Sequence, residues 1–269
     1  GSDEDVEHLQ VDGDVLRLGD LVLPVAAGTG DGTGAQVHDR QHYRLTGWRT
    51  GQCGYRRFFS ITSLAALRQE DRTVFDATHT EVRRWFDESL VDGVRIDHPD
   101  GLSDPAGYLA WRRELTGPTA WIVAEKTLAT DASLDSSLPV DGSTGYDALR
   151  EVGGLFVDPT GAAALTKLAA PNDATSEIEL KTTAVTDTLA SELARLCRVI
   201  SASTGVRDAR LPAAVAALVG RIPVYRCDYP ALAAVLPVAL AETAVATPEL
   251  ADMLAIVAAA VSTSPEAAA

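Results

Sequence analysis

The hydrophobic and polar residues at the start of the chain follow a short period. Residues 11–26, VDGDVLRLGDLVLPVA, alternate apolar and polar side chains around Asp-Gly and Gly-Asp pairs, which predicts short strands joined by turns. Residues 28–34, GTGDGTG, indicate a flexible loop; they lack the Gly-Lys-Ser/Thr ending of a phosphate-binding loop, so a nucleotide site is not favoured. Residues 41–61 are rich in aromatic residues and arginine, which suits the lining of a sugar or ligand cleft and equally an irregular loop pinned by its own rings.

Residues 73–90 change to a helical period. Apolar side chains recur there every three to four positions, which predicts a helix with one apolar face. We expect Asp92-Gly93 to end this helix, because glycine breaks a helical pattern. The residues of the predicted apolar face are Phe75, Val82, Trp85, Phe86 and Leu90.

Strands and helices then alternate. The short apolar runs at 94–97 and 119–126 each predict a strand. Between them lies an expected helix with Ser103 as its N-cap and a Gly-Pro pair after its end. The order helix, strand, helix, strand predicts parallel strands joined by right-handed crossovers, and 142–149, GSTGYDAL, mark the end of a further strand.

Beyond residue 160 the chain becomes rich in alanine and leucine. We expect helices at 184–200, at 211–220 and over much of 231–261, after a polar connection at 169–183. The most apolar run, ADMLAIVAAAV at 251–261, is too short to cross a bilayer.

Composition and charge narrow the range of functions. The chain has 269 residues, of which 46% are hydrophobic and 23% charged, as expected for a globular protein. Its formal net charge is −15 and its pI about 4.7, which disfavours a nucleic-acid partner because phosphate binding needs a basic face. The acidic surface is compatible with a neutral substrate, with a cation, or simply with solubility.

Cysteine use and the N-terminal stretch favour a cytoplasmic protein. Cys53, Cys197 and Cys227 are far apart, odd in number and form no Cys-x-x-Cys pair, which disfavours a disulfide framework or a zinc site. The acidic stretch GSDEDVEHLQ is not a signal peptide. We therefore expect a soluble, cytoplasmic protein without a membrane partner.

Two carboxylates follow the two predicted strands. Because side chains alternate along a strand, Arg95 and Asp97 share one face of the first strand, and Glu125 lies at the end of the second. Ligands collect at the carboxyl ends of parallel strands. If the strands are neighbours, the carboxyls lie roughly 5 Å apart, which is the spacing of a retaining glycosidase with one nucleophile and one general acid/base, whereas an inverting enzyme needs a wider gap.

The neighbouring residues fit this interpretation. Arg95 is expected to pair with Asp97 and keep it ionised. Glu125 has to start protonated, and we expect Trp121 and Val123, on the same face of their strand, to desolvate it and raise its pKa. An Arg–Asp pair at a strand end is also a common purely structural feature, and spacing alone does not separate the two readings.

Three further polar residues near the strand ends, His98, Asp100 and Lys126, are expected to bind sugar hydroxyls; Lys126 is the only lysine among the first 160 residues. An alternative is a metal site formed by Asp97, His98, Asp100 and Asp104, although neither His-Glu-x-x-His nor EF-hand spacing is present. A serine or cysteine nucleophile has less support, because DGSTG is not the Gly-x-Ser-x-Gly elbow and no cysteine has a nearby histidine partner in the sequence.

The strings around the two carboxylates also carry a family resemblance. GVRIDHPDGLSDPAGYL at 93–109, followed by WIVAEKTL at 121–128, resembles the α-amylase superfamily and, within it, the maltooligosyl trehalose synthases. HYRLTGWR, YRRFFSI, LPVDGSTGYDAL and VYRCDY are similar to that family as well, in the same order. The resemblance therefore covers nearly the whole chain.

The resemblance implies an intramolecular transglycosylation. In it, Asp97 attacks the anomeric carbon of the penultimate glucose of a maltodextrin while Glu125 protonates the leaving oxygen. The released glucose then attacks the glycosyl-enzyme through its own anomeric hydroxyl, with Glu125 as base, so an α-1,4 link becomes an α,α-1,1 link. This double displacement requires neither a metal nor a nucleotide cofactor, and water has to be kept out.

The resemblance also implies an architecture, namely part of an α-amylase-type (β/α)8 TIM barrel with a mostly helical C-terminal insertion. We expect an irregular or β segment lining the substrate cleft at 1–62, barrel units with the carboxylates at 63–160, and a helical subdomain at 161–269. The segment 41–61 and two pairs, Tyr146-Asp147 and Tyr225-Arg226, are expected to wall in the released glucose. The predicted substrate-binding residues are Arg95, His98, Asp100, Lys126, Tyr146, Asp147, Tyr225 and Arg226.

The sequence departs from the family pattern in two respects. Lys126-Thr127 stands where Lys-Ile is usual. The chain also lacks an N-terminal Asp-[Ile/Val]-x-Pro-Asn-His motif and a later His-Asp motif, and holds about three of the eight barrel units. We therefore expect a portion of a longer enzyme that is inactive without its remaining N- and C-terminal barrel segments. An amylase-like retaining hydrolase and a non-catalytic glucan-binding or scaffold piece remain as alternatives.

Overall fold

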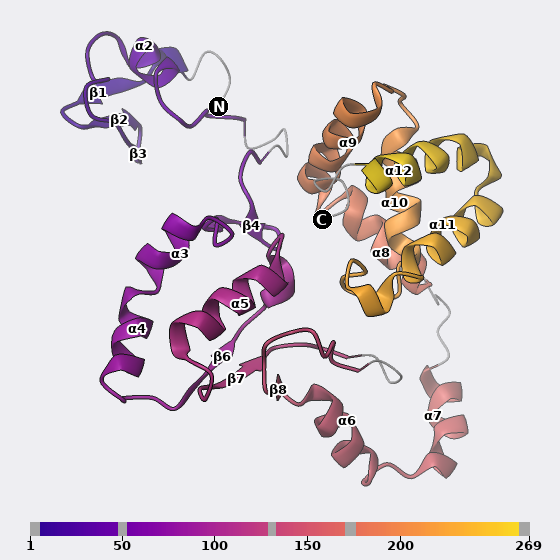
Figure 1. Ribbon diagram of the computed structural model, residues 1–269. Helices are drawn as coiled ribbons and strands as arrows, with labels where there is room; N and C mark the ends of the chain where they lie inside the picture. Colours follow the sequence, from indigo (N-terminus) through magenta and orange to yellow (C-terminus); the bar gives the residue numbers. More distant parts are fainter. Residues whose placement is uncertain (1–5, 48–52, 129–132, 170–175, 264–269) are drawn as a thin grey trace. The chain divides into compact units, whose positions relative to one another are not determined.

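The computed structural model combines helices with small sheets, in line with the mixed fold predicted from the sequence (Figure 1). The described residues are 6–47, 53–128, 133–169 and 176–263. The chain forms two compact units, the first made of Gly1–Ala65 and Leu189–Glu192, the second of Ala66–Thr188 and Leu193–Ala269. The predicted division at 62/63 and 160/161 stays a prediction.

The first unit contains a small antiparallel sheet. Its three strands are joined by tight turns at Gly13 and Gly19, both of which have positive φ, a conformation that glycine adopts without strain. The sheet confirms the short strands that alternation predicted for 11–26. Its members are β1 Gln10–Asp12, β2 Val15–Leu18 and β3 Leu21–Pro24.

A short helix, α2 Gly34–Asp39, follows the glycine-rich segment 28–34, which was predicted as a loop; the sequence analysis made no prediction for the residues after it. Thr33 begins it with a capping box, in which the Thr33 hydroxyl accepts the Gln36 N–H and the Gln36 side chain accepts the Thr33 N–H. A Cβ at position 34 would clash with the carbonyl of Leu9, so the close approach of this helix requires glycine. The buried core of the unit consists of Leu9, Leu16 and Val37.

The aromatic and arginine-rich segment 41–61 is partly β in structure. Residues 48–52 lie outside the described residues. Among the others, β4 Arg57–Phe58 pairs antiparallel with β5 Ile61–Ala65. The lining of a substrate cleft by this segment stays a prediction.

Two helices replace the single helix predicted over 73–90. α3 Arg72–Thr78 and α4 Thr80–Asp87 meet at His79, whose backbone departs from helical geometry at φ −106° and ψ 8°. The His79 ring turns back toward the carbonyl oxygen of Phe75, 2.7 Å away, and stacks on the Phe75 ring with centroids 4.0 Å apart. The helix is therefore interrupted at His79, whose ring contacts the preceding turn, although the spacing of apolar residues alone predicted one continuous helix.

The end of this helical region also differs from the prediction. α4 ends at Asp87, before the Asp-Gly pair that was expected to end it, and Ser89 then takes a left-handed φ of 53°. Trp85 and Leu90, two members of the predicted apolar face, are exposed. The periodicity identified a helix but not what its outer turns contact.

A parallel sheet lies in the second unit. β6 pairs with β7 and β7 pairs with β8, all parallel, and α5 connects the first two strands. This confirms the parallel order that the alternation of helix and strand predicted. The elements are β6 Gly93–Ile96, α5 Pro105–Thr116, β7 Trp121–Ala124 and β8 Gly142–Ser143.

The cap of α5 is Asp104 and not Ser103 as predicted. The Asp104 carboxylate accepts the Gly107 N–H at 2.8 Å. Ser103 instead donates its N–H and its hydroxyl to one carboxylate oxygen of Glu70, at 2.6 and 2.8 Å. The predicted end of the helix is confirmed, because Gly117 closes it with a φ of 87°.

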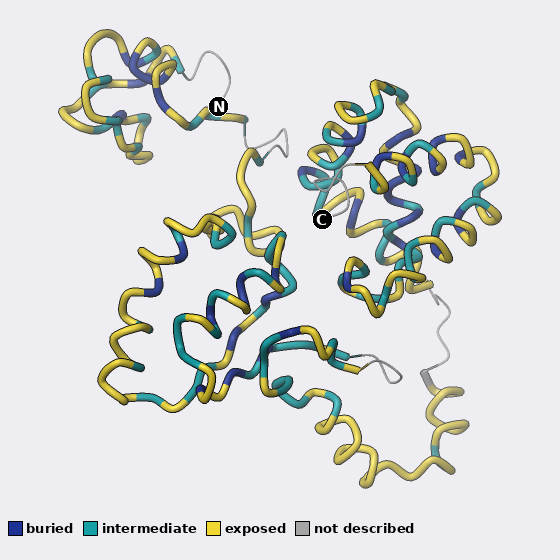
Figure 2. The backbone as a smooth tube through the Cα atoms, in the orientation of Figure 1, coloured by how far each residue is buried: buried dark blue, intermediate teal, exposed yellow. Residues whose placement is uncertain are grey.

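Buried residues gather along β6, α5 and β7 (Figure 2). The core there is formed mainly by apolar side chains from these elements and from α3, and it also takes in Tyr229 from much later in the chain. Its buried members are Phe75, Ile96, Tyr108, Leu109, Ile122, Leu138 and Tyr229.

Two helices, α6 Tyr146–Gly154 and α7 Ala162–Ala169, follow the sheet with a 3₁₀ turn between them, η3 Pro159–Gly161. The apolar residues 155–157 that lie between α6 and this turn are strongly exposed (Figure 2).

The predicted C-terminal helices are present, although the one expected over 184–200 is divided between two helices, Glu177–Thr186 and Ala190–Thr204. Part of the expected polar connection at 169–183 is helical, because Ser176 begins α8 with a capping box to Glu179; residues 170–175 lie outside the described residues. The predicted helix over 231–261 is divided by a turn at Pro248. The helices are α8 Glu177–Thr186, α9 Ala190–Thr204, α10 Leu211–Arg221, α11 Val235–Ala246 and α12 Ala251–Thr263, with 3₁₀ turns η4 Pro230–Leu232 and η5 Pro248–Leu250.

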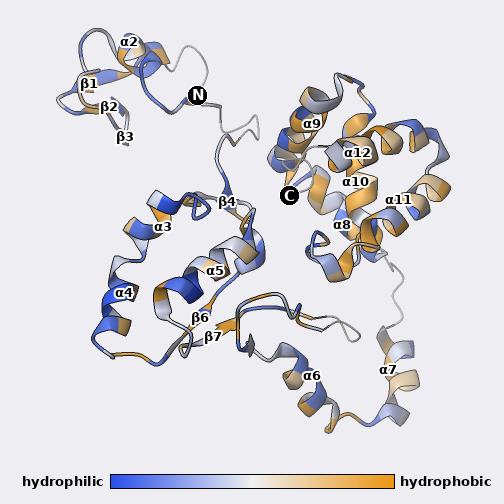
Figure 3. Cartoon of the chain, viewed as in Figure 1, coloured by the Kyte–Doolittle hydropathy of each residue, from blue (hydrophilic) through white to orange (hydrophobic). Residues whose placement is uncertain are grey.

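These helices have a core of their own. α10 contacts α8, α11 and α12, and apolar residues dominate α10 and α11 (Figure 3). Its most deeply buried members include Leu211, Val215, Leu254 and Val257. Among the described residues, no single helix combines the length and the apolar character needed to cross a membrane. One pair of helices, Pro230–Ala246 and Pro248–Thr263, is long and apolar enough only when the two are taken together, and the pair is bent by 116°.

Candidate active site

The parallel register brings the two predicted carboxylates to the same edge of the sheet. Ile96 pairs with Ala124 at the end of the β6–β7 ladder, and the Glu125 N–H still donates to the Ile96 carbonyl at 2.8 Å. Asp97 and Glu125 are therefore the first residues beyond the paired ends of two adjacent strands. Parallel strands place such residues side by side, whatever lies between them in the sequence.

Arg95 joins the two carboxylates directly. Its Nη2 lies 2.6 Å from Oδ1 of Asp97 and 3.1 Å from Oε1 of Glu125. The two oxygens are thus no farther apart than the sum of these distances. That sum is less than roughly 6.5 Å, the shortest separation of the two carboxyl groups in inverting glycosidases. The pairing of Arg95 with Asp97 was predicted, whereas its second bond, to Glu125, was not.

The pKa of Glu125 is lowered, which corrects the predicted increase. The largest cause is the backbone N–H of His98, which donates to Oε2 at 3.0 Å, followed by the Tyr146 hydroxyl, which donates to Oε1 at 3.1 Å. Donors aimed at a carboxylate stabilise its ionised form. Trp121, which was expected to desolvate Glu125, is 66% exposed.

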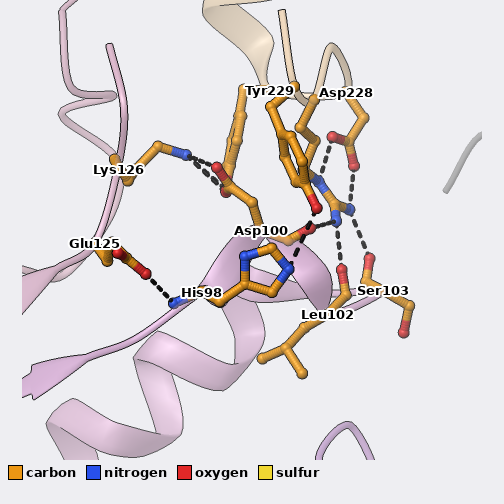
Figure 4. Close-up of polar contacts among 10 residues, drawn as sticks. His98, Asp100, Leu102, Ser103, Glu125, Lys126, Asp228 and Tyr229 are labelled. Atoms are coloured by element: carbon orange, nitrogen blue, oxygen red, sulfur yellow. Dashed lines mark hydrogen bonds and ion pairs between the residues drawn. The ribbon is translucent and has the colours of Figure 1, made fainter. Parts of the chain in front are cut away.

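His98 takes an unusual backbone conformation to reach Glu125. Its φ of 48° and ψ of 46° lie in the left-handed region, which a residue with a side chain rarely adopts. The turn directs the His98 N–H to Glu125 (Figure 4) and leaves the ring Nε2 3.2 Å from the Tyr225 hydroxyl. Gly101 passes beneath this ring, where a Cβ would lie 2.5 Å from Cδ2 of His98. Strain of this kind concentrates at functional sites.

Asp100 and Lys126 bind each other within the site. Lys126 Nζ lies 2.7 and 2.8 Å from the two Asp100 carboxylate oxygens, and the Tyr229 hydroxyl donates to Oδ1 at 2.7 Å (Figure 4). The Lys126 and Asp100 side chains are only 10% and 14% exposed. Their binding of sugar hydroxyls stays a prediction, but their polar atoms already have partners. Tyr229, which lies 129 positions from Asp100, was not singled out in the sequence, although it stands in the string VYRCDY.

Arg226 holds the turn that follows β6. Its guanidinium donates to the carbonyl oxygens of Asp100, Leu102 and Ser103 and forms a two-nitrogen ion pair with Asp228 (Figure 4). Arg226 was predicted to contact substrate, and the structure places its donors on the backbone of the turn. Asp228, which orients the guanidinium, was not singled out in the sequence.

The two residues of the predicted pair Tyr146-Asp147 lie in different environments. Tyr146, at the start of α6, directs its hydroxyl to Glu125, and this bond to a carboxylate raises the Tyr146 pKa. Asp147 instead accepts a hydrogen bond from the Ser143 hydroxyl at 3.3 Å. The structure thus brings Tyr146 to the carboxylates and ties Asp147 to the end of β8.

The metal alternative finds no support in the described part of the chain. No group of three or more His, Cys, Asp or Glu residues there has an arrangement that holds a metal ion. Asp104, one of the proposed ligands, caps α5, and Asp100 is paired with Lys126.

Comparison with known proteins supports the resemblance seen in the sequence. No sequence-family profile matches the chain. A protein of Mycobacterium tuberculosis H37Rv, provisionally named maltooligosyl trehalose synthase, is 64% identical over 274 aligned residues, which take in 100% of this chain and 36% of that protein. The chain thus spans about a third of the length of the curated relatives it matches.

Solved structures agree with the sequence comparison. The maltooligosyltrehalose synthase of Arthrobacter ramosus superposes with a TM-score of 0.83 at 39% identity, over 99% of this chain and 35% of that one. The DSM5389 glycosyltrehalose synthase superposes with a TM-score of 0.67 at 26% identity, over 92% and 36%. The chain is therefore similar, through its whole length in sequence and nearly all of it in structure, to about a third of the length of maltooligosyl trehalose synthases.

Proposed function

We propose that this chain carries the two catalytic carboxylates of a maltooligosyl trehalose synthase. Asp97 is the nucleophile and Glu125 the general acid/base. The reaction converts the reducing-end α-1,4 linkage of a maltodextrin into an α,α-1,1 linkage, as a (1→4)-α-D-glucan 1-α-D-glucosylmutase does. The matched relatives are named as maltooligosyl trehalose synthases and are about three times as long as the chain.

The observation that carries the proposal is the shared contact of Asp97 and Glu125 with one nitrogen of Arg95. A separation this short leaves no room for a water molecule between the carboxyl and the sugar, so a single displacement by water is disfavoured. It suits a double displacement through a covalent glycosyl-enzyme, in which each step inverts the anomeric carbon and the α configuration is kept.

Atom by atom, the first step forms a bond between a carboxylate oxygen of Asp97 and the anomeric carbon, while the bond to the leaving O4 breaks and that oxygen takes the Glu125 proton. In the second step Glu125 removes the proton from the anomeric hydroxyl of the released glucose, whose oxygen displaces Asp97. Bond making and breaking balance without a metal or a nucleotide. Arg95 holds the Asp97 carboxylate through Nη2 before the attack.

The protonation of Glu125 depends on the bound substrate. The hydrogen bonds from the His98 N–H and the Tyr146 hydroxyl lower the pKa of the free Glu125 carboxyl and so favour its ionised form. A bound glucan expels water from the site, and desolvation raises the pKa of a carboxyl. The same exclusion of water favours attack by the released glucose over hydrolysis.

We further propose that β6, β7 and β8 are strands of an α-amylase-type (β/α)8 barrel in the complete enzyme. Their parallel order and the helical connection through α5 support this. The helices after residue 160 then form an insertion, and the remaining barrel strands come from the part of the relatives that this chain does not match. We place the complete enzyme in the cytoplasm.

The first prediction concerns Asp97. In the longest natural polypeptide that contains this chain, Asp97→Asn is expected to lower kcat at least about a thousandfold, because a neutral amide is a poor nucleophile. The assay follows maltopentaose: its reducing ends should disappear without release of glucose, and NMR of the product should show the α,α-1,1 linkage.

Asp76→Asn, at an exposed position of α3 where Asp76 pairs with Arg72, is the matched control and should retain activity. Release of glucose as the main product would identify an amylase-like hydrolase instead. Full activity of the Asp97→Asn protein would overturn the catalytic role and leave a glucan-binding or scaffold piece.

A further inference from the structure

Three polar side chains, one buried and two largely shielded from solvent, join three separate segments beside the carboxylates. They are Asp100 from the turn after β6, Lys126 from the segment after β7, and Tyr229 from the start of η4. Besides the bonds to Asp100, Lys126 Nζ lies 3.3 Å from the Tyr229 hydroxyl and 4.3 Å from the centre of its ring. Tyr229 is only 8% exposed and belongs to the core beneath the sheet. We call Asp100, Lys126 and Tyr229 the anchor cluster.

The anchor cluster lies close to both carboxylates in the sequence. Lys126 directly follows Glu125, and Asp100 lies three residues after Asp97. The backbone hydrogen bonds between the β6 and β7 segments extend as far as the Glu125 N–H, which donates to the Ile96 carbonyl, and end before Asp100 and Lys126. Beyond that point, the Asp100–Lys126 pair ties the two carboxylate-bearing segments together through side chains.

We propose that Asp100, Lys126 and Tyr229 are positioning residues, which hold the turn after β6 so that the His98 N–H faces Glu125 and the Asp97 and Glu125 carboxylates keep their short separation. The inference rests on the function proposed above, because it assigns these residues a task in that reaction. It differs from the expectation that Asp100 and Lys126 bind sugar hydroxyls directly.

The physical cost of the cluster supports this assignment. Removing two charges from water is unfavourable, and well-packed apolar side chains often stabilise a fold as much as a buried ion pair does. What a satisfied ion pair adds is a defined geometry: both Asp100 oxygens are bound by Lys126, and Tyr229 contributes a further bond to one of them. Arg226 restrains the same turn through its backbone.

The left-handed turn at His98 explains why such an anchor is needed. A non-glycine residue leaves this conformation unless its surroundings hold it there. If the anchor cluster is broken, the turn relaxes and the His98 N–H withdraws from Glu125. The groups that face Glu125 are the His98 N–H, the Tyr146 hydroxyl, the Asp97 carboxyl and the Arg95 guanidinium.

The experiment compares Tyr229→Phe, Asp100→Asn and Lys126→Met. Carbon-13 NMR of the Glu125 carboxyl in the 269-residue chain is the first measurement, since it does not depend on activity. Loss of the His98 donor is expected to raise the Glu125 pKa by about one unit in all three variants. A direct charge effect acts otherwise: loss of the Lys126 charge raises the pKa, loss of the Asp100 charge lowers it, and Tyr229→Phe changes no charge.

The second measurement is the rate with maltopentaose in the longest natural polypeptide that contains the chain. We expect kcat to fall on the order of 10- to 100-fold with KM nearly unchanged, because misplaced catalytic groups slow the chemical step. The conservative variant Lys126→Arg should recover part of the loss. A KM increase with unchanged kcat would instead identify Asp100 and Lys126 as sugar ligands and overturn the proposal.

Asp141→Asn is the matched control. Asp141 also forms an ion pair, with Arg113 at 2.9 Å, but it accepts the backbone N–H of Ile122 near the beginning of β7. This variant should lower stability without shifting the Glu125 pKa or the rate. Opposite pKa shifts in Asp100→Asn and Lys126→Met, with none in Tyr229→Phe, would overturn the positioning role. If the unaltered protein lacks activity on maltodextrins, the proposed function fails, while the NMR titration still decides whether the cluster holds the turn.

Discussion

His79 is a titratable polar side chain that is buried in an apolar core. It is buried, stacks on Phe75 and lies with Nε2 3.0 Å from the Tyr108 hydroxyl. Burial is the largest cause that lowers its pKa below the ordinary 6.5, and the charge of Arg112 acts in the same direction. The folded protein therefore keeps the imidazole neutral at pH values where the unfolded chain already takes up a proton.

This gives a prediction for the dependence of stability on pH. A histidine whose folded-state pKa is lowered contributes stability that is present above its unfolded pKa and is lost as the pH falls through the folded pKa. The free energy of unfolding should thus decrease between about pH 7 and pH 5. Urea unfolding of the unaltered chain and of His79→Gln checks this.

The substituted chain should show a shallower slope, since glutamine does not titrate. Equal slopes in the two proteins would contradict the assignment. If His79→Gln does not fold, the Hε1 resonance of His79 in the unaltered chain gives the same answer, because its titration midpoint should lie below 6.5.

At the scale of elements, helix ends depend on which of several polar residues wins a local competition. Ser103 and Asp104 both suit an N-cap by type. Ser103 is engaged by Glu70 from 33 residues earlier, so Asp104 accepts the Gly107 N–H. Gly107 fits this role because a Cβ there would clash with the Asp104 carboxylate. The cap directly follows the turn that carries His98 and Asp100, and thus sets where that turn ends.

The corresponding prediction is that Asp104→Ala lowers the free energy of unfolding by about 1 kcal/mol, because the first turn of α5 loses the acceptor of one N–H. Chemical denaturation measures the change. Glu114→Ala in the same helix is the control: it removes an exposed ion pair with Arg72, which contributes about 0.5 kcal/mol or less. An equal loss in both variants would argue against Asp104 as the cap.

At the scale of the whole molecule, the described residues form three separate buried cores rather than one. The first unit is built around Leu16, the parallel sheet around Phe75 and Ile122, and the C-terminal helices around Val215 and Val257. No described residue belongs to more than one of them. Local opening in one core therefore need not open another.

Hydrogen exchange tests this independence. Leu16→Ala leaves a cavity in the first core and should destabilise that unit by roughly 2 to 5 kcal/mol. Amides of β2 and α2 should then exchange faster, while amides of α10 and α12 keep their rates. Leu21→Ala, at an exposed position of the same sheet, should change little. Faster exchange in α10 would show that the cores unfold together.

The candidate site was predictable in part. Strand phase and chain order were enough to expect Asp97 and Glu125 at neighbouring strand ends and Arg95 paired with Asp97, because period-two alternation and parallel pairing are properties of short segments. The sequence did not predict the contacts of Tyr229 and Asp228 or the second bond of Arg95. Each of these contacts depends on a partner whose position in space no local pattern encodes.

The sequence by itself determined the order of strands and helices, the faces of each strand, and the residue types at the strand ends. These follow from local periodicity and from the steric preferences of individual residues. Only the tertiary structure decided the break at His79, the cap of α5, the lowered pKa of Glu125 and the contact of Tyr229 with Asp100. The physical reason is the same in each case: hydrogen bonds and burial depend on the atoms that folding brings near, and those atoms come from segments distant in the chain.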